Sequence, residues 1–501
     1  MRQLPAPASG DPRVDVAEGD ALGSLSEFKR QQQVYAQAEK KVRSSRARLL
    51  LAATRLAEGR AFYNLGQPEN AISALEEAKS VFAAAGDKAG IASALSSLAS
   101  VYGDQTDIPH EIQMHQQSLA ISREIGDKRL TSSSLNNLAI LFKDQGRYDD
   151  ALKLHEEALA LRREIGDKSW TANSLNNIGV VFFEQDRFSE AQKNYMESLE
   201  ICREIGDRRG LVRALHNLSV VKRELGKLAE ARKGYEESLA IRQEIGDKRG
   251  GVIGRVELAM VLIEMGELAS AKRTIEEAFP LARDTKLRPG EAMAFFLLGE
   301  IALAEDDLPA ARKHHEAALQ TRKELREDRT ILESRVALAN IALEEGHALD
   351  AEAAINDLQK DLSGGGPAPA QTMADLLLVR ALLDQNKISA AAVAMMSAQK
   401  MAVAAQRQDE RAMNIITDAR LYSARKQPEV ALQKLNSLLP GLNQNGAIQL
   451  QLETRLAQCE ARFRSSPPSG AQECAVSLAK DSESRGFKRI ARKARVLLRD
   501  R

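Results

Sequence analysis

Two kinds of hydrophobic spacing alternate along most of this sequence, and each is typical of one face of an α-helix. In the first, apolar or small residues stand at positions i, i+1 and i+4. Examples are Leu138, Ala139 and Phe142, then Ile178, Gly179 and Phe182, and in part Leu218 and Ser219. The second consists of Leu152, His155, Ala158, Leu159 and Leu161. A glycine between them, such as Gly146, ends a helix readily. The pattern therefore predicts helix–turn–helix units.

The units recur every forty residues. Gly-Asp pairs fall at Gly86, Gly126, Gly166, Gly206 and Gly246, where Gly ends one helix and Asp can cap the next. Each unit also carries a small residue near the helix crossing, where two helices can approach closely. These positions are Ala71, Ala151, Ala191, Ala231, Ala271, Ala311, Ala351, Ala391 and Ala431, with Glu111 the exception. A fixed period of this length is typical of a solenoid.

Changes in this pattern suggest the chain's divisions. We expect a disordered leader over 1–21, a packing helix over 22–44 and the main repeat array over 45–362. A flexible Gly/Pro loop follows at 363–371, then a degenerate array at 372–484 and a basic capping helix at 485–501 with a solvated face. The unit from Ile91 to Lys128 departs from the pattern at Pro109 and Glu111, so we expect its second helix to be shifted.

Composition supports a helical, interaction-type protein and narrows its partners. The 501 residues include only 4% aromatics, and 71 basic residues balance 70 acidic ones to a net charge of +1. Such a balance creates no overall electrostatic attraction to nucleic acid or to a membrane, and we expect neither as a partner. Cys202, Cys459 and Cys474 show no metal-ligand spacing, and their odd number predicts no disulfide framework. With no apolar targeting segment, we expect a reducing, cytoplasmic location.

The unit at Leu135–Lys168 resembles a tetratricopeptide repeat. The resemblance rests on Leu138-Ala139, Phe142, Gly146, Tyr148, Ala151, His155 and Ala158, and it covers roughly residues 45–460. The forty-residue spacing is similar to the longer-repeat subclass of Partner-of-Inscuteable and kinesin-light-chain proteins. The resemblance implies an all-α, right-handed superhelical solenoid of about 10–11 helix pairs. It also implies binding of peptide segments on the concave wall, rather than catalysis.

We find no motif for catalysis, for a metal or for a cofactor, and we expect none of the three. His115, His155 and His315 occupy the same place in their units, which favours a packing role in place of an aromatic ring. His314 and His315 are adjacent on a helix, so their side chains point about 100° apart and cannot share an ion.

One row of amides recurs on the predicted inner wall, at Asn137, Asn177 and Asn217. An asparagine offers both a donor and an acceptor, which suits the backbone of an extended peptide. The resemblance supports this use for these three residues. The alternative is that they bond to the neighbouring helix and hold the stack together, and the sequence leaves both open.

A second row is acidic and lies one turn further along. It contains Asp104, Asp144, Glu184, Glu224, Glu264, Glu344 and Asp384. Acids near a helix C-terminus oppose the helix dipole, so capping does not explain them. Either they attract a basic segment, or they form a solvated face paired with Arg147, Arg187 and Lys227. Between the rows stand Ile140, Val180, Val220 and Met260, with Phe183 as an aromatic anchor.

These features favour a non-catalytic scaffold that binds an extended or helical segment of a partner protein. We expect the contacts at Asn137, Asn177, Asn217, Ile140, Val180, Phe183, Asp144, Glu184 and Glu224. If the acidic row is a contact surface, the segment is basic; the alternative is the solvated face. The alternative is the regulatory arm of a larger bacterial signalling protein, for example one with a serine/threonine kinase or a transcriptional regulator domain.

Overall fold

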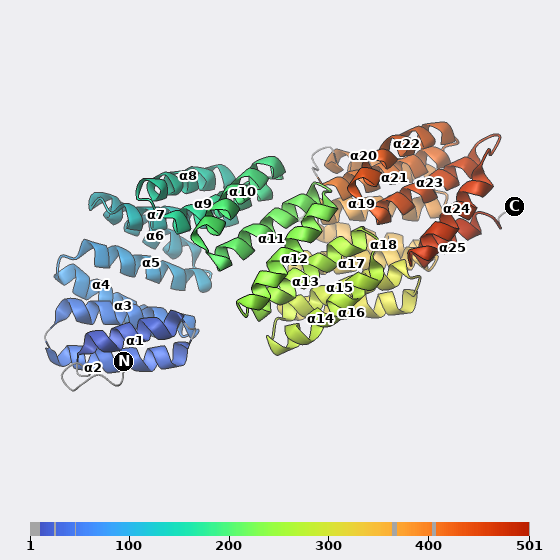
Figure 1. Cartoon of the computed structure of the whole chain (residues 1–501). Coiled ribbons are helices and arrows are strands. Elements are labelled where there is room, and N and C mark those ends of the chain that lie inside the picture. Colours follow the sequence, from blue (N-terminus) through green and yellow to red (C-terminus); the bar gives the residue numbers. More distant parts are fainter. Residues whose placement is uncertain (1–10, 25–26, 46, 363–367, 403–406, 500–501) are drawn as a thin grey trace. The chain divides into compact units, whose positions relative to one another are not determined.

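The computed structural model describes residues 11–24, 27–45, 47–362, 368–402 and 407–499, and every regular element in these ranges is a helix (Figure 1). Two compact units divide the chain. Unit 1 comprises Met1–Gln185 and Glu200–Ile205, and unit 2 comprises Asp186–Leu199 and Gly206–Arg501.

Unit 1 contains α1 to α9 and the end of α10. Their bounds are α1 Pro12–Ser24, α2 Phe28–Ser45, α3 Arg48–Asn64, α4 Pro68–Ala84, α5 Lys88–Asp104, α6 Ile108–Glu124, α7 Lys128–Asp144, α8 Tyr148–Glu164, α9 Lys168–Glu184 and α10 Phe188–Ile205. Unit 2 holds the rest. These are α11 Arg208–Glu224, α12 Leu228–Glu244, α13 Lys248–Glu264, α14 Leu268–Asp284, α15 Arg288–Ala304, α16 Leu308–Leu325, α17 Asp328–Glu344, α18 Ala348–Leu362, α19 Ala368–Asp384, α20 Ile388–Ala402, α21 Gln408–Ala424, α22 Pro428–Asn445, α23 Ile448–Arg464, α24 Ala471–Ser484 and α25 Lys488–Val496.

Consecutive helices pack as hairpins, which confirms the all-α repeat fold. The helices α1–α24 make twelve pairs, more than the ten or eleven predicted. The additional pair is α1 with α2, so the prediction of disorder is wrong for residues 12–21; residues 1–10 lie outside the described part. The second helix of the repeat that contains Pro109 is not shifted either. This helix, α6, begins forty residues before α8, and Pro109 lies in its first turn. A proline there loses no intrahelical hydrogen bond.

The turns form as their residues predict. Gly146 adopts φ 73° and Gly166 φ 71°, a left-handed conformation that suits glycine at a helix end. The carboxylate of Asp167 then accepts a hydrogen bond from the backbone N–H of Trp170 at 3.1 Å, which caps α9. The same cap recurs at Asp87, Asp127, Asp207 and Asp247. The Gly-Asp pair that recurs every forty residues thus ends one helix and caps the start of the next.

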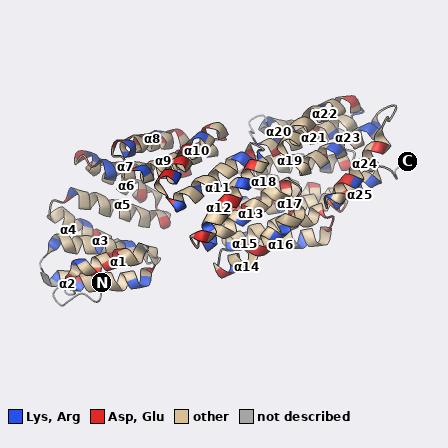
Figure 2. Cartoon of the chain, viewed as in Figure 1, with Lys and Arg blue, Asp and Glu red and all other residues tan. Residues whose placement is uncertain are grey.

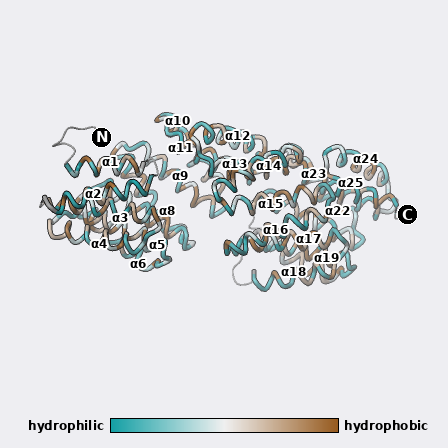
Figure 3. Tube along the Cα trace, turned by 90° about the horizontal axis from the view of Figure 1, so that it is seen from below, coloured by the Kyte–Doolittle hydropathy of each residue, from teal (hydrophilic) through white to brown (hydrophobic). Residues whose placement is uncertain are grey.

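First helices, the odd-numbered ones, line one side of each unit. Helix α5 packs on α7, and α7 on α9, in addition to their own second helices. Among the described residues no comparable packing joins second helices, so the first helices lie on the inside of the curve. The small residues at the crossings, including Ala151 and Ala231, are completely buried. Hydrophobic and hydrophilic positions accordingly alternate along the helices (Figure 3).

The three histidines at equivalent places are packing residues, as predicted. His115, His155 and His315 are all buried, and the equivalent position holds Leu75, Tyr235 and Leu435 in other repeats. Burial lowers the pKa of His115 and of His155 to about 4, which keeps both rings neutral near pH 7.

Acid should therefore destabilise unit 1 through these histidines. Because the folded pKa lies below the unfolded value near 6.5, the unfolded chain binds more protons, and stability is lost as pH falls from about 6.5 toward 4. For His155 the loss is about 3 kcal/mol at the acid end. The slope of the unfolding free energy against pH gives the number of protons taken up on unfolding. We expect His155→Leu to lower this number by about one, as measured by urea denaturation at several pH values. The exposed His110, changed to Gln, is the control, and an equal effect there would contradict the assignment.

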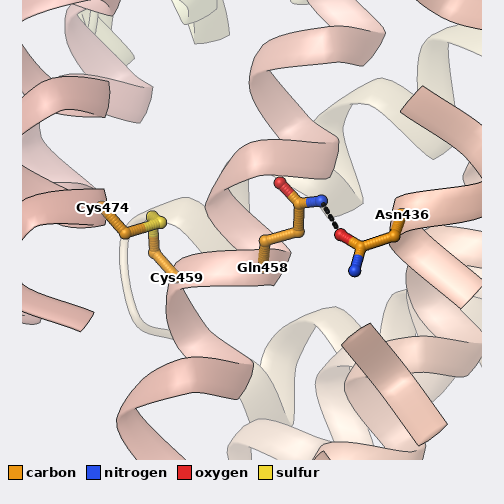
Figure 4. Close-up of a disulfide and its surroundings, with 4 residues drawn as sticks. All are labelled: Asn436, Gln458, Cys459 and Cys474. Carbon is orange, nitrogen blue, oxygen red and sulfur yellow. Dashed lines mark hydrogen bonds between the residues drawn. A yellow bond between two sulfur atoms is a disulfide. The ribbon is translucent and has the colours of Figure 1, made fainter. Parts of the chain in front are cut away.

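One disulfide is present, so the prediction of no disulfide framework is wrong. Cys459 of α23 and Cys474 of α24 are bonded, with their Cα atoms 5.6 Å apart (Figure 4). The cysteines are fifteen residues apart, and the helical hairpin brings them face to face. An odd count leaves room for one such pair. In the same region Gln458 donates a hydrogen bond to Asn436 at 2.8 Å, which joins α23 to α22 (Figure 4).

The last helix, α25, differs from the predicted cap with a solvated basic face. Its Phe487 cap residue, Ile490 and Ala491 are buried in the core of unit 2. Arg489 is also buried, and it bonds to Glu344 and Glu453. The helix packs on α15 as well as on its neighbours in sequence.

Candidate functional site

The inner face of unit 1 repeats the same chemistry on two adjacent helices, α7 and α9. Asn137 and Asn177 are half-buried, Ile140 is exposed and Val180 is half-buried. Asp144 and Glu184 are exposed at the helix ends, and Phe183 is half-buried beside Glu184. The residues between them, such as Leu138 and Ile178, are buried in the core. The structure thus separates a packing face from an accessible face within each helix.

In the amide row, Asn177 forms a hydrogen bond that joins two neighbouring first helices, α7 and α9. Asn177 donates to Asn136 of α7 at 2.9 Å and to Asn173 of its own helix at 3.3 Å. At the equivalent position of α5, forty residues before Asn137, Ser97 accepts a hydrogen bond from Arg60 of α3 at 2.9 Å. For Asn177 the structure therefore shows the stack-holding role that the sequence left open.

The acidic row of unit 1 is accessible. Asp104, Asp144 and Glu184 are all exposed, and Asp144 pairs with Lys143 at 2.7 Å. Burial raises the pKa of Glu111, and the charges of Asp104 and Asp144 add to this effect, so the three acids lie near each other. The pairing expected with Arg147 is not observed, because Arg147 bonds to Asp150 at 2.6 Å and covers the ring of Phe142.

In unit 2 two acids of the same row, Glu224 and Glu344, are buried, whereas Glu264 is half-buried and Asp384 is exposed. Glu224 is buried and pairs with Arg223 at 2.7 Å and with Arg407 at 3.4 Å. Burial raises the pKa of Glu264 to about 8. Glu344 is enclosed by Arg380, Arg489 and Lys493, each within 2.9 Å. Asn217, the remaining amide, also belongs to unit 2 and is half-buried.

The predicted site residues therefore fall into two groups. Unit 1 brings together Asn137, Ile140, Asp144, Asn177, Val180, Phe183 and Glu184 on adjacent helices. Asn217 and Glu224 lie in unit 2, where Glu224 is engaged within the protein. Sequence reasoning missed the basic partners of the acidic row. The signal available was the density of Lys and Arg in the last helix, at Lys488, Arg489, Arg492, Lys493 and Arg495 (Figure 2).

Other kinds of site were searched for in the part of the chain that the structure describes. No three His, Cys, Asp or Glu side chains come together in an arrangement that could hold a metal ion. Within the same ranges, each helix is too short or too polar to cross a bilayer.

Comparisons with known families agree with the helix pairs. A family model described as tetratricopeptide repeat matches residues 130–204 and 170–244. A second, described as a MalT-like TPR region, matches residues 209–454. The chain is a tetratricopeptide-repeat protein. A third model, described as anaphase-promoting complex subunit 5, matches residues 34–105 of this repeat protein.

Three solved structures with similar folds are distant in sequence from this tetratricopeptide-repeat protein. The apo form of RapI is 17% identical, with a TM-score of 0.46 over 55% of this chain and 99% of that one. The quorum sensor NprR from B. thuringiensis is 14% identical, with a TM-score of 0.47 over 62% of this chain and 87% of that one. A signal-transduction ATPase with a tetratricopeptide repeat sensor, from Pyrococcus horikoshii, is 14% identical. Its TM-score is 0.46 over 74% of this chain and 52% of that one. No curated protein sequence matches.

The repeat class suggests a protein-interaction domain, and this class is generally non-catalytic. Assignment to the longer-repeat subclass stays a prediction.

Proposed function

We propose that this protein is a non-catalytic scaffold that binds an extended or helical segment of a partner protein on the inner face of unit 1. One observation supports the proposal most strongly. On both α7 and α9 the same three positions stay accessible while their neighbours are buried: an amide, a β-branched aliphatic residue and a terminal acid. Packing explains the buried positions. It leaves all three accessible positions of α7 available for a ligand, whereas on α9 the amide of Asn177 already bonds to Asn136.

Each position contributes a different interaction with such a segment. The Asn137 amide can bond the segment's backbone, since it offers a donor and an acceptor. Ile140, Val180 and Phe183 offer apolar surface for its side chains. Asp144 and Glu184 favour a segment with lysine or arginine, through charge-assisted hydrogen bonds. The proposed partner segment is therefore amphipathic and basic.

The test uses peptides selected on the full chain from a random library displayed on phage. A variant with Asn137→Ala, Ile140→Ala and Asp144→Ala should bind them at least about tenfold more weakly, since it loses a charged hydrogen bond as well as apolar contact. The matched control changes Lys153 and Glu156, exposed residues of α8, to Ala and should leave the affinity unchanged. Equal affinities for both variants would refute the proposal.

Asn177→Ala should behave differently from Asn137→Ala. Because Asn177 bonds to Asn136 across the helices, its loss should lower the free energy of unfolding of unit 1 by about 1 kcal/mol. Asn137→Ala should lower it by clearly less, as measured by urea denaturation. If both changes cost the same stability, the amide row has one role rather than two.

Two further hypotheses stay predictions. One is that the chain serves as the regulatory arm of a larger bacterial signalling protein. The other is a cytoplasmic location, and the Cys459–Cys474 disulfide is an observation against it, since reducing compartments keep most thiols reduced.

A further inference from the structure

Unit 2 contains a cavity that the proposed function does not use. Its volume is about 1040 Å³, comparable with pockets that hold metabolites or short peptides. The C-terminal ends of α17, α19, α21 and α23 form one side, and α25 forms another. Apolar surface comes from Leu343, Leu383 and Ile388. The cavity therefore combines an apolar wall with the charged residues of α25.

Positive charge is in excess over the residues that line the cavity. The lining holds six cations, which are Arg380, Arg420, Lys426, Arg464, Arg492 and Lys493. It holds four carboxylates, which are Glu344, Asp384, Glu429 and Glu460. At the inner end Glu344 receives Arg380 and Arg489 at 2.9 Å and Lys493 at 2.7 Å, so three cations share one carboxylate.

Asp384 of α19 faces the cations of the inner end, since the charges of Arg380, Lys493 and Arg420 act on it. Burial raises the pKa of Asp384, and these three cations oppose the rise. Burial also lowers the pKa of Lys493 to about 8, and the nearby Arg380 adds to the effect by repulsion. The lining of the cavity thus holds more cations than carboxylates.

Polar atoms at the inner end also lack hydrogen-bond partners on the protein. Ser423 is 3% exposed, and its Oγ has none. Arg492 Nη2 and Glu344 Oε2 are buried without one, and the 3.8 Å between them is too long for a direct hydrogen bond. All three residues line the cavity. The Arg492 N–H and the Ser423 O–H are donors that an oxygen of a bound anion would satisfy.

We infer that this cavity binds a small organic anion bearing carboxylate or phosphate groups. Arg492, Lys493 and Ser423 contact its charged end, and Lys426 and Arg464 contact it at the mouth. Guanidinium groups match the oxygens of both anions, in pairs of parallel hydrogen bonds. The ligand relieves the repulsion between Lys493 and Arg380. Since α25 supplies two of the contacts, binding also stabilises the docking of this helix.

Calorimetric titration of the full chain with citrate, pyrophosphate and spermidine tests the inference, with sodium chloride added to equal ionic strength. We expect citrate or pyrophosphate to bind saturably, once per chain, and to raise the unfolding temperature of unit 2. Which of the two binds more tightly distinguishes carboxylate from phosphate. Saturable binding of spermidine instead, or of none of the three, would overturn the inference.

A variant at the mouth shows whether binding occurs in this cavity. Lys426→Asn keeps a residue that tolerates the φ of 62° there, and Arg464→Gln keeps an exposed polar chain. Together they should weaken binding about tenfold, without changing the unfolding temperature of the free protein. Lys323→Gln, at an exposed position of α16, is the control. Equal losses in variant and control would show unspecific surface binding and reject the site. The result is independent of peptide binding to unit 1.

Discussion

Changing Glu344 to Leu is expected to lower the free energy of unfolding of unit 2 by about 3–5 kcal/mol, a large share of the 5–15 kcal/mol typical of a domain. The side chain of Glu344 is fully buried and bonds to Arg380, Arg489 and Lys493. Without it, three cations remain close together in a region of low dielectric, with no carboxylate between them. Urea denaturation measures the loss, and hydrogen exchange should show α25 opening first.

Glu244→Leu is the matched control, since it also removes one carboxylate from an ion pair in unit 2. Glu244 pairs with Arg208 on the surface, where its side chain is 60% exposed. Such pairs contribute about 0–1 kcal/mol. If the two variants were equally stable, the network around Glu344 would not hold α25 in place.

Reducing the disulfide should have the next largest effect. Cys459 and Cys474 close a loop of fifteen residues, for which chain entropy predicts about 3 kcal/mol of stabilisation. Dithiothreitol should therefore lower the unfolding temperature of unit 2. The variant Cys459→Ala with Cys474→Ala should be equally destabilised, and insensitive to the reductant.

Alkylation followed by mass spectrometry shows whether the bond exists in the purified protein. Without reductant only Cys202 should be modified, and only after denaturation, since it is buried. Modification of Cys459 in the unreduced, denatured chain would show that the bond does not form. An unchanged unfolding temperature after complete reduction would show that it does not stabilise unit 2.

Local signals explain why the repeat fold was predictable from sequence. Helix ends at Gly166 and Asp167 depend only on neighbouring residues, because a left-handed glycine and a capping carboxylate act within one turn. The completely buried Ala151 and the histidine slot follow from contacts within one helix pair, which the forty-residue period repeats. The exception is α1 with α2, whose residues lack that period although they form a pair.

Contacts between distant repeats could not be predicted in the same way. Glu344 and Arg489 are 145 residues apart, and they meet because of the curvature that many helix pairs accumulate. A small change of angle at each crossing would separate them, and no residue pattern specifies that angle. The acidic row was therefore visible in the sequence, whereas its accessibility in unit 1 and the burial of Glu224 and Glu344 in unit 2 were not.

Part of the proposed binding surface is accessible in the structure. Ile140, Asp144 and Glu184 are accessible, as a ligand-binding role requires. Asn177 could be assigned to either of two roles, because one amide can bond a ligand or a neighbouring helix. The choice depended on Asn136 of α7, whose side chain lies within reach of Asn177 only in the folded stack.

Hydrogen exchange of the full chain, with and without a selected peptide, tests the central claim most directly. Binding to the inner face of unit 1 predicts slower exchange in α7 and α9, with α8 and the helices of unit 2 unchanged. Slower exchange confined to second helices such as α8, with none in α7 or α9, would contradict it.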